Sequence, residues 1–203
     1  MDFDVLIVGG GAAGMSCALI LGSAQKKSYA KNRKVGIILH QKTSDLQNAL
    51  FNNVLGLPAG TKGIALLKDG PKQLKKLYPK VVQIENEKVL KISPNSFGYT
   101  VETNKDKVYR AKKVVIAAGY SDFLQIKGLE TYIISHKKSE ADKKRIQLKN
   151  EDHLVAPNLH VAGNLAGHRS QFAIACGSGA AVATDILTEW NNGMQTKVHD
   201  KLK

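Results

Sequence analysis

Three glycines near the start of the chain, Gly9, Gly11 and Gly14, have the GxGxxG spacing of a phosphate-binding turn. In such a turn the first glycine allows a tight bend, and the second lets a pyrophosphate approach the backbone. The third lets the next helix pack closely on the preceding strand, and the helix N-terminus faces the anion. The spacing alone is a weak signal, but here it follows an apolar run and precedes a helical pattern. We therefore predict a nucleotide-binding site at this turn.

The other reactive side chains form no obvious site. Cys17 and Cys176 are the only cysteines, so the sequence offers no disulfide framework and no metal-ligand spacing, and we expect no metal site. We expect both to be small residues of the core in a protein of the reducing cytoplasm. His168 precedes the last predicted helix, and we consider it as a proton donor for the site beside the commoner case of a solvent-facing histidine.

An α/β fold has to position the glycine turn. The buried run at residues 3–8, a helix from residue 12 to about residue 24 and the buried run at 35–39 together make a βαβ unit. This unit predicts a Rossmann-like fold with a central parallel sheet.

The remaining elements follow from periodicity and turn residues. A helix is predicted at residues 64–77, interrupted at Asp69-Gly70-Pro71, after a loop-dominated stretch at 43–63. Short strands are predicted at 81–85, 89–92, 99–103 and 108–111, and three of them form an antiparallel meander. Two buried strands at 113–118 and 159–162 and a long helix at 170–190 complete the set, with a polar connector at 120–150.

The first apolar run has a second interpretation as a membrane segment, since residues 5–22 carry no charge. A signal peptide needs a positively charged start, but Asp2 and Asp4 precede the run. A spanning helix would not normally carry three successive glycines, because each weakens the helix. We reject both readings and expect no membrane association.

The charge is strongly basic: 30 Lys and Arg against 17 Asp and Glu give a formal net charge of +13. A solvated surface explains it, and so does a surface that attracts an acidic partner. The basic runs carry no interleaved aromatics and no nucleic-acid motif, so we do not expect nucleic-acid binding.

Four segments together resemble the flavin domain of the low-molecular-weight thioredoxin reductases and their relatives. They are IVGGGAAG, NNVLGLPAGTKGIALL, KKVVIAAG and NLHVAGNLAGHRSQFAIACGSGAAVA, in this order between about residues 3 and 190. The last one, similar to a Gly-Asp followed by a helix that opens in Arg-Gln-Ala, is much more specific than GxGxxG.

The resemblance implies FAD as the cofactor, in a three-layer fold with a central parallel sheet and a three-stranded meander. It implies that the pyrophosphate lies on Gly9, Gly11, Ala12, Ala13 and Gly14. It further implies roles for His40 and Gln41 near the adenosine ribose and for Val82 near the adenine through its backbone. Asn53 would lie beside the isoalloxazine, and Gly119 would close the strand beneath the cofactor. Gly163 and Asn164 replace the Gly-Asp whose carboxylate binds the ribityl chain and phosphate region, and Gln171 and Phe172 match the start of the last helix.

Two positions depart from the family pattern. His40 stands where a carboxylate normally binds the ribose, and Asn164 stands where the family has the Asp of Gly-Asp. Both replacements are neutral at pH 7. Lys42, just after His40, would suit a 2′-phosphate, so an NADP-binding Rossmann protein stays open as an alternative.

A larger departure lies between the third and fourth segments. Only residues 120–158 lie there, where the resemblance implies a second nucleotide domain with a redox-active CxxC. We therefore predict one FAD domain at 1–190 with a basic tail at 191–203, and not a complete thioredoxin reductase.

The flavin would be the only redox centre, supplied with electrons by free NAD(P)H or by a small acidic redox protein. A non-catalytic flavin-binding module is the alternative, and the family implies a possible homodimer.

Overall fold

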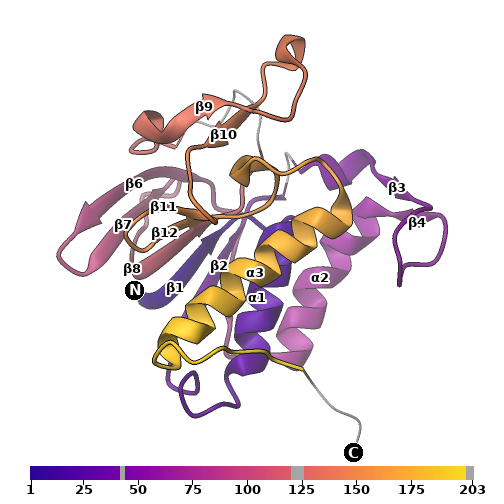
Figure 1. Ribbon diagram of the computed structural model, residues 1–203. Helices are drawn as coiled ribbons and strands as arrows, with labels where there is room; N and C mark the ends of the chain where they lie inside the picture. Colours follow the sequence, from indigo (N-terminus) through magenta and orange to yellow (C-terminus); the bar gives the residue numbers. More distant parts are fainter. Residues whose placement is uncertain (42–43, 120–125, 200–203) are drawn as a thin grey trace, which may run out of the picture.

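The computed structural model of the protein describes residues 1–41, 44–119 and 126–199. A mostly parallel central sheet has a layer of long helices on one face, α1 (Ala12–Ala24), α2 (Gly63–Leu77) and α3 (Phe172–Trp190). These helices run side by side across the sheet (Figure 1). Lys42, the residue considered for a 2′-phosphate, lies outside the described residues.

The parallel part of the sheet carries the strand order expected for a nucleotide-binding fold. Its members are β1 (Asp2–Val8), β2 (Val35–Leu39), β5 (Val82–Glu85), β8 (Val108–Ile116) and β12 (Leu159–Val161), in the spatial order β12-β8-β1-β2-β5. β11 (Leu154–Ala156) pairs antiparallel with β12 at the edge. The predicted fold class, a three-layer Rossmann-like α/β fold, is confirmed.

The meander grows out of one long strand. β6 (Val89–Asn95) pairs with β7 (Gly98–Thr103), and β7 pairs antiparallel with the first half of β8. The second half of β8 pairs with β12, while β1 runs along the other side. The sequence predicted two separate strands here, at 108–111 and 113–118, and this is wrong because the chain continues straight through Lys112 from one partner to the next.

Alternation along β1 explains why both faces of the sheet are covered. Val5 and Ile7 point into the core under the helices, whereas Leu6 and Val8 point into the core under the meander. All four are at most 5% exposed. The strand therefore reads as a continuous apolar run, as a strand buried on both faces must.

Short elements fill the connections that the sequence left as loops. They are η2 (Asp45–Asn48), β3 (Leu50–Phe51), β4 (Thr61–Lys62), η3 (Glu130–Tyr132), β9 (Ile133–Ser135), η4 (Ala141–Lys143), β10 (Ile146–Leu148) and η5 (Gly163–Ala166). β9 and β10 form an antiparallel hairpin, which stands apart from the central sheet at the top of Figure 1.

Helix α2 is continuous, so the predicted interruption at Asp69-Gly70-Pro71 is wrong. Pro71 lies inside the helix and has no N–H to give to the carbonyl of Leu67, four residues earlier. The side chain of Gln41 supplies the missing donor, with Nε2 3.1 Å from Leu67 O. A tertiary hydrogen bond thus replaces the local one that proline removes.

Helices α1 and α3 touch backbone to backbone. A Cβ added at Gly179 in α3 would lie 1.9 Å from the carbonyl oxygen of Ala13 in α1. Two residues earlier on the same helix, Gly177 has open space around its missing Cβ. The contact at Gly179 therefore sets the distance between the two helices.

The stretch after α3 is partly packed against the domain. The sequence treats 191–203 as a basic tail, but Thr196 is buried and Val198 packs against the core under the helices. The Thr196 N–H donates to Thr188 Oγ1 at 3.2 Å. Across the described part of the chain, none of the helices has the length and apolar character needed to cross a bilayer.

Replacing Gly179 with alanine is expected to lower the free energy of unfolding by about 1–3 kcal/mol, because the methyl group would force α1 and α3 apart. The matched change Gly177→Ala is expected to raise it by up to about 1 kcal/mol, because alanine favours the helix. Urea denaturation of both variants measures the difference. Equal effects at the two positions would contradict the packing role of Gly179.

Candidate functional site

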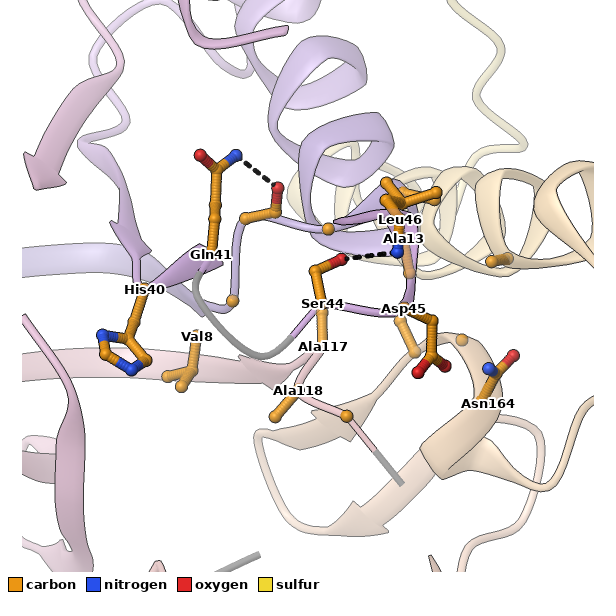
Figure 2. Close-up of a pocket in the computed structure, with 18 of the residues that line it drawn as sticks. Val8, Ala13, His40, Gln41, Ser44, Asp45, Leu46, Ala117, Ala118 and Asn164 are labelled. Atoms are coloured by element: carbon orange, nitrogen blue, oxygen red, sulfur yellow. Dashed lines mark hydrogen bonds between the residues drawn. The ribbon is translucent and has the colours of Figure 1, made fainter. Parts of the chain in front are cut away.

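A cavity of about 560 Å³ opens at the carboxyl ends of the parallel strands. Val8 ends β1, Ala117 follows β8 and Ala162 follows β12, and all three line it. Ligands of open α/β sheets bind at this edge. Figure 2 draws part of the lining, with Val8 at the end of β1 and Ala117 and Ala118 after the neighbouring strand β8.

The glycine turn is built by two close backbone approaches. Gly9 has φ +115°, and a Cβ there would lie 2.4 Å from Ala117 O. A Cβ on Gly14 would lie 1.9 Å from Gly9 O, so the helix can pack on the strand only with glycine at this position. Gly11 differs, because its φ is −79° and the nearest atom to an added Cβ is Ser44 Oγ at 3.6 Å. Its missing side chain leaves space in the cavity rather than inside the fold.

Two long helices present their N-termini to this one cavity. Gly11, Ala12 and Ala13 line it from the start of α1, and Gln171 and Phe172 line it from the start of α3. Neither helix has a side-chain cap or an acidic residue in its first turn. The unpaired amides and the helix dipoles therefore favour an anion or an electron-rich group in the cavity.

Asn164 brings an unpaired acceptor to the same cavity. It lies in η5, directly after Gly163, whose φ is +79°. Its Nδ2 donates to Ser170 Oγ at 3.3 Å. Its Oδ1 is buried and has no hydrogen-bond partner among the described residues. A buried carbonyl oxygen without a donor is costly, and a ligand hydroxyl would satisfy it.

His40 and Gln41, which the resemblance assigns to the adenosine ribose, line the cavity after β2. Gln41 has a structural task there, since its Nε2 donates to Gly10 O at 2.9 Å (Figure 2) and also to Leu67 O. The Gln41 side-chain amide therefore connects the glycine turn to the turn of α2 in which Pro71 leaves the Leu67 carbonyl without its helical donor.

The prediction for Val82 needs correction. Val82 pairs with Gly36, near the start of β2, and it does not line the cavity at the far end of that strand. Glu87, Lys88 and Val89 line this part of the cavity instead. The resemblance pointed to a residue at the start of β5, whereas the residues that line the cavity follow the end of that strand.

The buried carboxylate of Glu87 is already satisfied by the protein. Its oxygens accept from Thr103 Oγ1 at 2.9 Å and Tyr109 Oη at 3.0 Å, and Lys107 lies 3.3 Å away. Burial alone would raise the pKa of Glu87, but these hydrogen bonds bring it below its usual value. Burial and the same carboxylate raise the pKa of Tyr109 to about 12. We assign Glu87 to the meander, not to a ligand.

Aromatic rings line another part of the cavity. The rings of Phe51 from β3 and Phe172 from α3 lie 4.9 Å apart at 49°. Asn53 and Gly119 also line the cavity, as the resemblance implied, together with Ile126. These residues offer apolar surface to a planar ligand.

The sequence missed the contribution of η2. Ser44 and Asp45 line the cavity, and Ser44 Oγ accepts from the Leu46 N–H as an N-cap. The signal was present as Ser44-x-x-Gln47, the spacing of a capping box. In Figure 2 Asp45 and Ser44 lie opposite the start of α1.

The structure places His168 and both cysteines outside the cavity lining. The His168 ring faces His153 instead, with centroids 5.2 Å apart. Cys17 is fully buried, and burial raises the pKa of its thiol to about 12. Cys176 is half-buried, and burial raises its pKa as well. Neither thiol has the environment of a reactive thiolate.

The cavity thus brings together most of the residues chosen from the sequence. Those that line it are Gly9, Gly11, Ala12, Ala13, His40, Gln41, Asn53, Gly119, Gly163, Asn164, Gln171 and Phe172. Gly14 lies behind the turn, where its contact with Gly9 positions the helix.

Residues 3–180 match the family of pyridine nucleotide-disulphide oxidoreductases. A comparison with curated protein sequences finds no match.

Solved structures with the same fold include several thioredoxin reductases. The enzyme from Gloeobacter violaceus has a TM-score of 0.71 at 15% identity, over 100% of this chain and 99% of that chain. The enzyme from T. acidophilum has a TM-score of 0.65 at 17% identity, over 95% of this chain and 99% of that one. A ferredoxin-flavin thioredoxin reductase from Clostridium acetobutylicum has a TM-score of 0.66 at 18% identity, over 94% and 99%.

The bridging amide of Gln41 leads to a testable coupling. Gln41→Ala is expected to lower the free energy of unfolding by about 1–2 kcal/mol, because Leu67 O and Gly10 O both lose a donor. In a Pro71→Ala background the backbone itself supplies an N–H to Leu67 O, so the same change should cost less. Urea denaturation of the four proteins gives the coupling energy. Equal losses in both backgrounds would show that Gln41 does not replace the missing helix bond.

Proposed function

The chain belongs to the pyridine nucleotide-disulphide oxidoreductase family, and from this we propose that it is a single-domain FAD-dependent oxidoreductase supplied with electrons by an external donor. The observation that supports the proposal is the cavity itself. It joins a glycine turn, two uncapped helix N-termini and the unpaired Asn164 Oδ1. A dinucleotide with phosphates, hydroxyls and a planar ring matches this set of groups.

The residues present fit FAD and divide the work of holding it. The amides of Gly11, Ala12 and Ala13 would bind the pyrophosphate, since the start of α1 has no cap of its own. Asn164 Oδ1 would accept from a hydroxyl of the ribityl chain. Phe51 and Phe172 would contact the flat ring. The start of α3 would stabilise negative charge on that ring.

When bound, FAD supplies two-electron redox chemistry, which the protein side chains do not. The sequence contains no CxxC, and Cys17 is buried in the core. In the part of the chain that the structure describes, no group of three or more His, Cys, Asp or Glu side chains is placed to hold a metal ion. The protein's part is therefore to bind, orient and shield the cofactor.

The β9–β10 hairpin is a candidate docking surface for the donor. Residues 127–149, here called the basic lobe, stand where the resemblance implied a nucleotide domain. They carry exposed lysines at 127, 137, 138, 143, 144 and 149. The acidic residues there are Glu130, Glu140 and Asp142, and Glu140 pairs with Lys143. A surface with this excess of positive charge attracts an acidic partner.

The lobe also lies next to the cavity wall. Asn150, just after it, donates from Nδ2 to Ala166 O in η5 at 3.2 Å. A structurally similar protein is named as a ferredoxin-flavin thioredoxin reductase. Both observations support a small acidic redox protein over free NAD(P)H as the donor. The cytoplasmic location and the homodimer stay predictions.

Gly11→Ala separates cofactor binding from folding. The added methyl group has room in the fold but occupies the phosphate cradle, so we expect FAD affinity to fall by about tenfold or more. The free energy of unfolding without FAD should change by less than about 1 kcal/mol. The visible spectrum of the purified proteins, with mass spectrometry of the compound released by heat, measures FAD retention.

Gly14→Ala is the matched control, because its methyl group would collide with Gly9 O and destabilise the fold itself. If the wild-type protein is colourless and stays colourless with added FAD, FAD is not its cofactor. The same titration with NADP then tests the alternative of an NADP-binding Rossmann protein.

Electron transfer from an acidic donor should depend on salt. Reduced ferredoxin or flavodoxin is expected to reduce the FAD-loaded protein at a rate that falls roughly tenfold or more as salt screens the surface charges. Lys137→Glu with Lys138→Glu should slow the transfer at low salt. Stopped-flow absorbance of the flavin band measures both effects.

Lys75→Glu with Lys76→Glu is the matched control, since these exposed lysines lie at the carboxyl end of α2, far from the basic lobe (Figure 1). The same slowing in the control would mean that only net charge matters. Reduction by light but by no biological donor would favour a non-catalytic flavin-binding module. Fast, salt-independent reduction by NADPH would favour free NAD(P)H as the donor.

A further inference from the structure

Three imidazoles lie directly behind the turn that carries Asn164, and none of them lines the cavity. His136 comes from the segment after β9, His153 from the loop before β11 and His168 from the loop before α3. We refer to His136, His153 and His168 as the histidine cluster. The cofactor-binding roles described above leave its hydrogen bonds unexplained.

The bonds of the cluster lead to the backbone of Gly163. His153 Nε2 lies 2.9 Å from Ser178 Oγ and 3.1 Å from His168 Nε2. Ser178 Oγ accepts the N–H of Gly163 at 2.8 Å. A continuous chain of contacts therefore runs from His168 through His153 and Ser178 to the residue that precedes Asn164.

These contacts are shielded from water. Ser178 is 5% exposed and the His153 side chain 11%. Burial lowers the pKa of His168, and the neighbouring His153, Lys138 and His136 lower it further. Two neutral imidazoles 3.1 Å apart share one N–H···N hydrogen bond, whereas two cationic rings would direct two protons at each other. The buried arrangement thus depends on at least one neutral ring.

His136 holds the same turn from the other side. Its Nδ1 accepts the N–H of Lys138 at 3.2 Å, so the neutral ring carries its proton on Nε2. That Nε2 lies 3.1 Å from Asn164 O and 3.2 Å from His168 O. The cluster therefore holds the turn at two points. It fixes the Gly163 N–H through Ser178, and it fixes the Asn164 carbonyl directly through His136.

We propose that His153 is a positioning residue for cofactor binding, acting through Ser178 to fix the Gly163–Asn164 turn so that Asn164 Oδ1 is held for the cofactor. This inference rests on the proposed FAD site. Gly163 adopts φ +79°, a conformation that glycine reaches without strain but does not hold by itself, and the bond to Ser178 Oγ fixes it. Without His153 the Ser178 hydroxyl loses its buried hydrogen-bond partner and is free to rotate toward another one.

The first test is the affinity of the protein for FAD, measured by the quenching of flavin fluorescence on titration. His153→Phe fills the space without a hydrogen bond, and Ser178→Ala removes the acceptor for Gly163. Each is expected to raise the Kd for FAD by about tenfold, the equivalent of one hydrogen bond. The double variant should be no weaker than Ser178→Ala alone, because His153 acts through Ser178.

Conservative rescue separates positioning from filling of space. His153→Gln places an amide near the position of Nε2 and is expected to restore the Kd to within about threefold of wild type. His160→Phe is the matched control, because His160 is also a half-buried histidine nearby but its Nε2 has no partner among the described residues. It should leave the Kd unchanged. Equal affinities for wild type, His153→Phe and Ser178→Ala would overturn the proposal.

A second measurement does not depend on the cofactor. Hydrogen exchange of the Gly163 amide, followed by NMR in the protein without FAD, should accelerate about tenfold or more in His153→Phe and in Ser178→Ala. If wild type binds no FAD, the proposed function fails, and this exchange rate alone decides whether His153 positions the turn. An unchanged exchange rate in both variants would refute the positioning role whether or not FAD binds.

Discussion

The close approach of backbones at glycine is the constraint on which the rest of this structure depends. Gly14 lets α1 start directly on the carbonyl of Gly9, and Gly179 lets α3 lie against the carbonyl of Ala13. Because both contacts lie near the same end of the sheet, the N-termini of α1 and α3 reach one cavity. A side chain at either glycine would separate the helices from the sheet or from each other, and the two sets of free amides would no longer face a single ligand.

The turn that carries Asn164, η5, is not held in place by its own backbone. η5 is four residues long, and Gly163 and Gly167 at or beside its ends have positive φ. Its position must come from the elements packed behind it, and these are the histidine cluster, Ser178 and Asn150. The connection between β8 and β12, which is short in this chain, supplies most of these groups. The segment that stands where the resemblance implies a second domain thus packs behind η5, and η5 in turn lines the cavity.

The sequence predicted the parts of the site that rest on local chemistry. The βαβ unit and the glycine turn follow from motifs whose residues lie close together in the chain. His40, Asn53 and Asn164, which line the cavity, were implied by the family resemblance. The prediction from sequence failed where contacts with residues far away in the chain determine the local structure. Pro71 does not break α2, because Gln41 satisfies Leu67 O, and β8 is one strand because β7 and β12 share its length. Val82 lies at the start of β5 and not at the cavity, because a motif gives the order of elements along the chain but not the position of a residue along its strand. The contact between the side chains of His168 and His153 cannot be predicted from any local sequence pattern.

Two neutral residues stand where the resemblance implies carboxylates, and the structure gives this a physical consequence. A carboxylate at position 40 or 164 would make stronger, charge-assisted hydrogen bonds to hydroxyl groups. It would also repel a pyrophosphate placed at the start of α1, in a cavity of low dielectric. With His40 and Asn164 instead, the proposed binding of FAD would depend on backbone amides, helix dipoles and uncharged acceptors that must point in the right direction. A neutral amide makes a weaker hydrogen bond than a carboxylate and depends more on its orientation, so the residues that fix the Asn164 turn gain importance as the charge is lost.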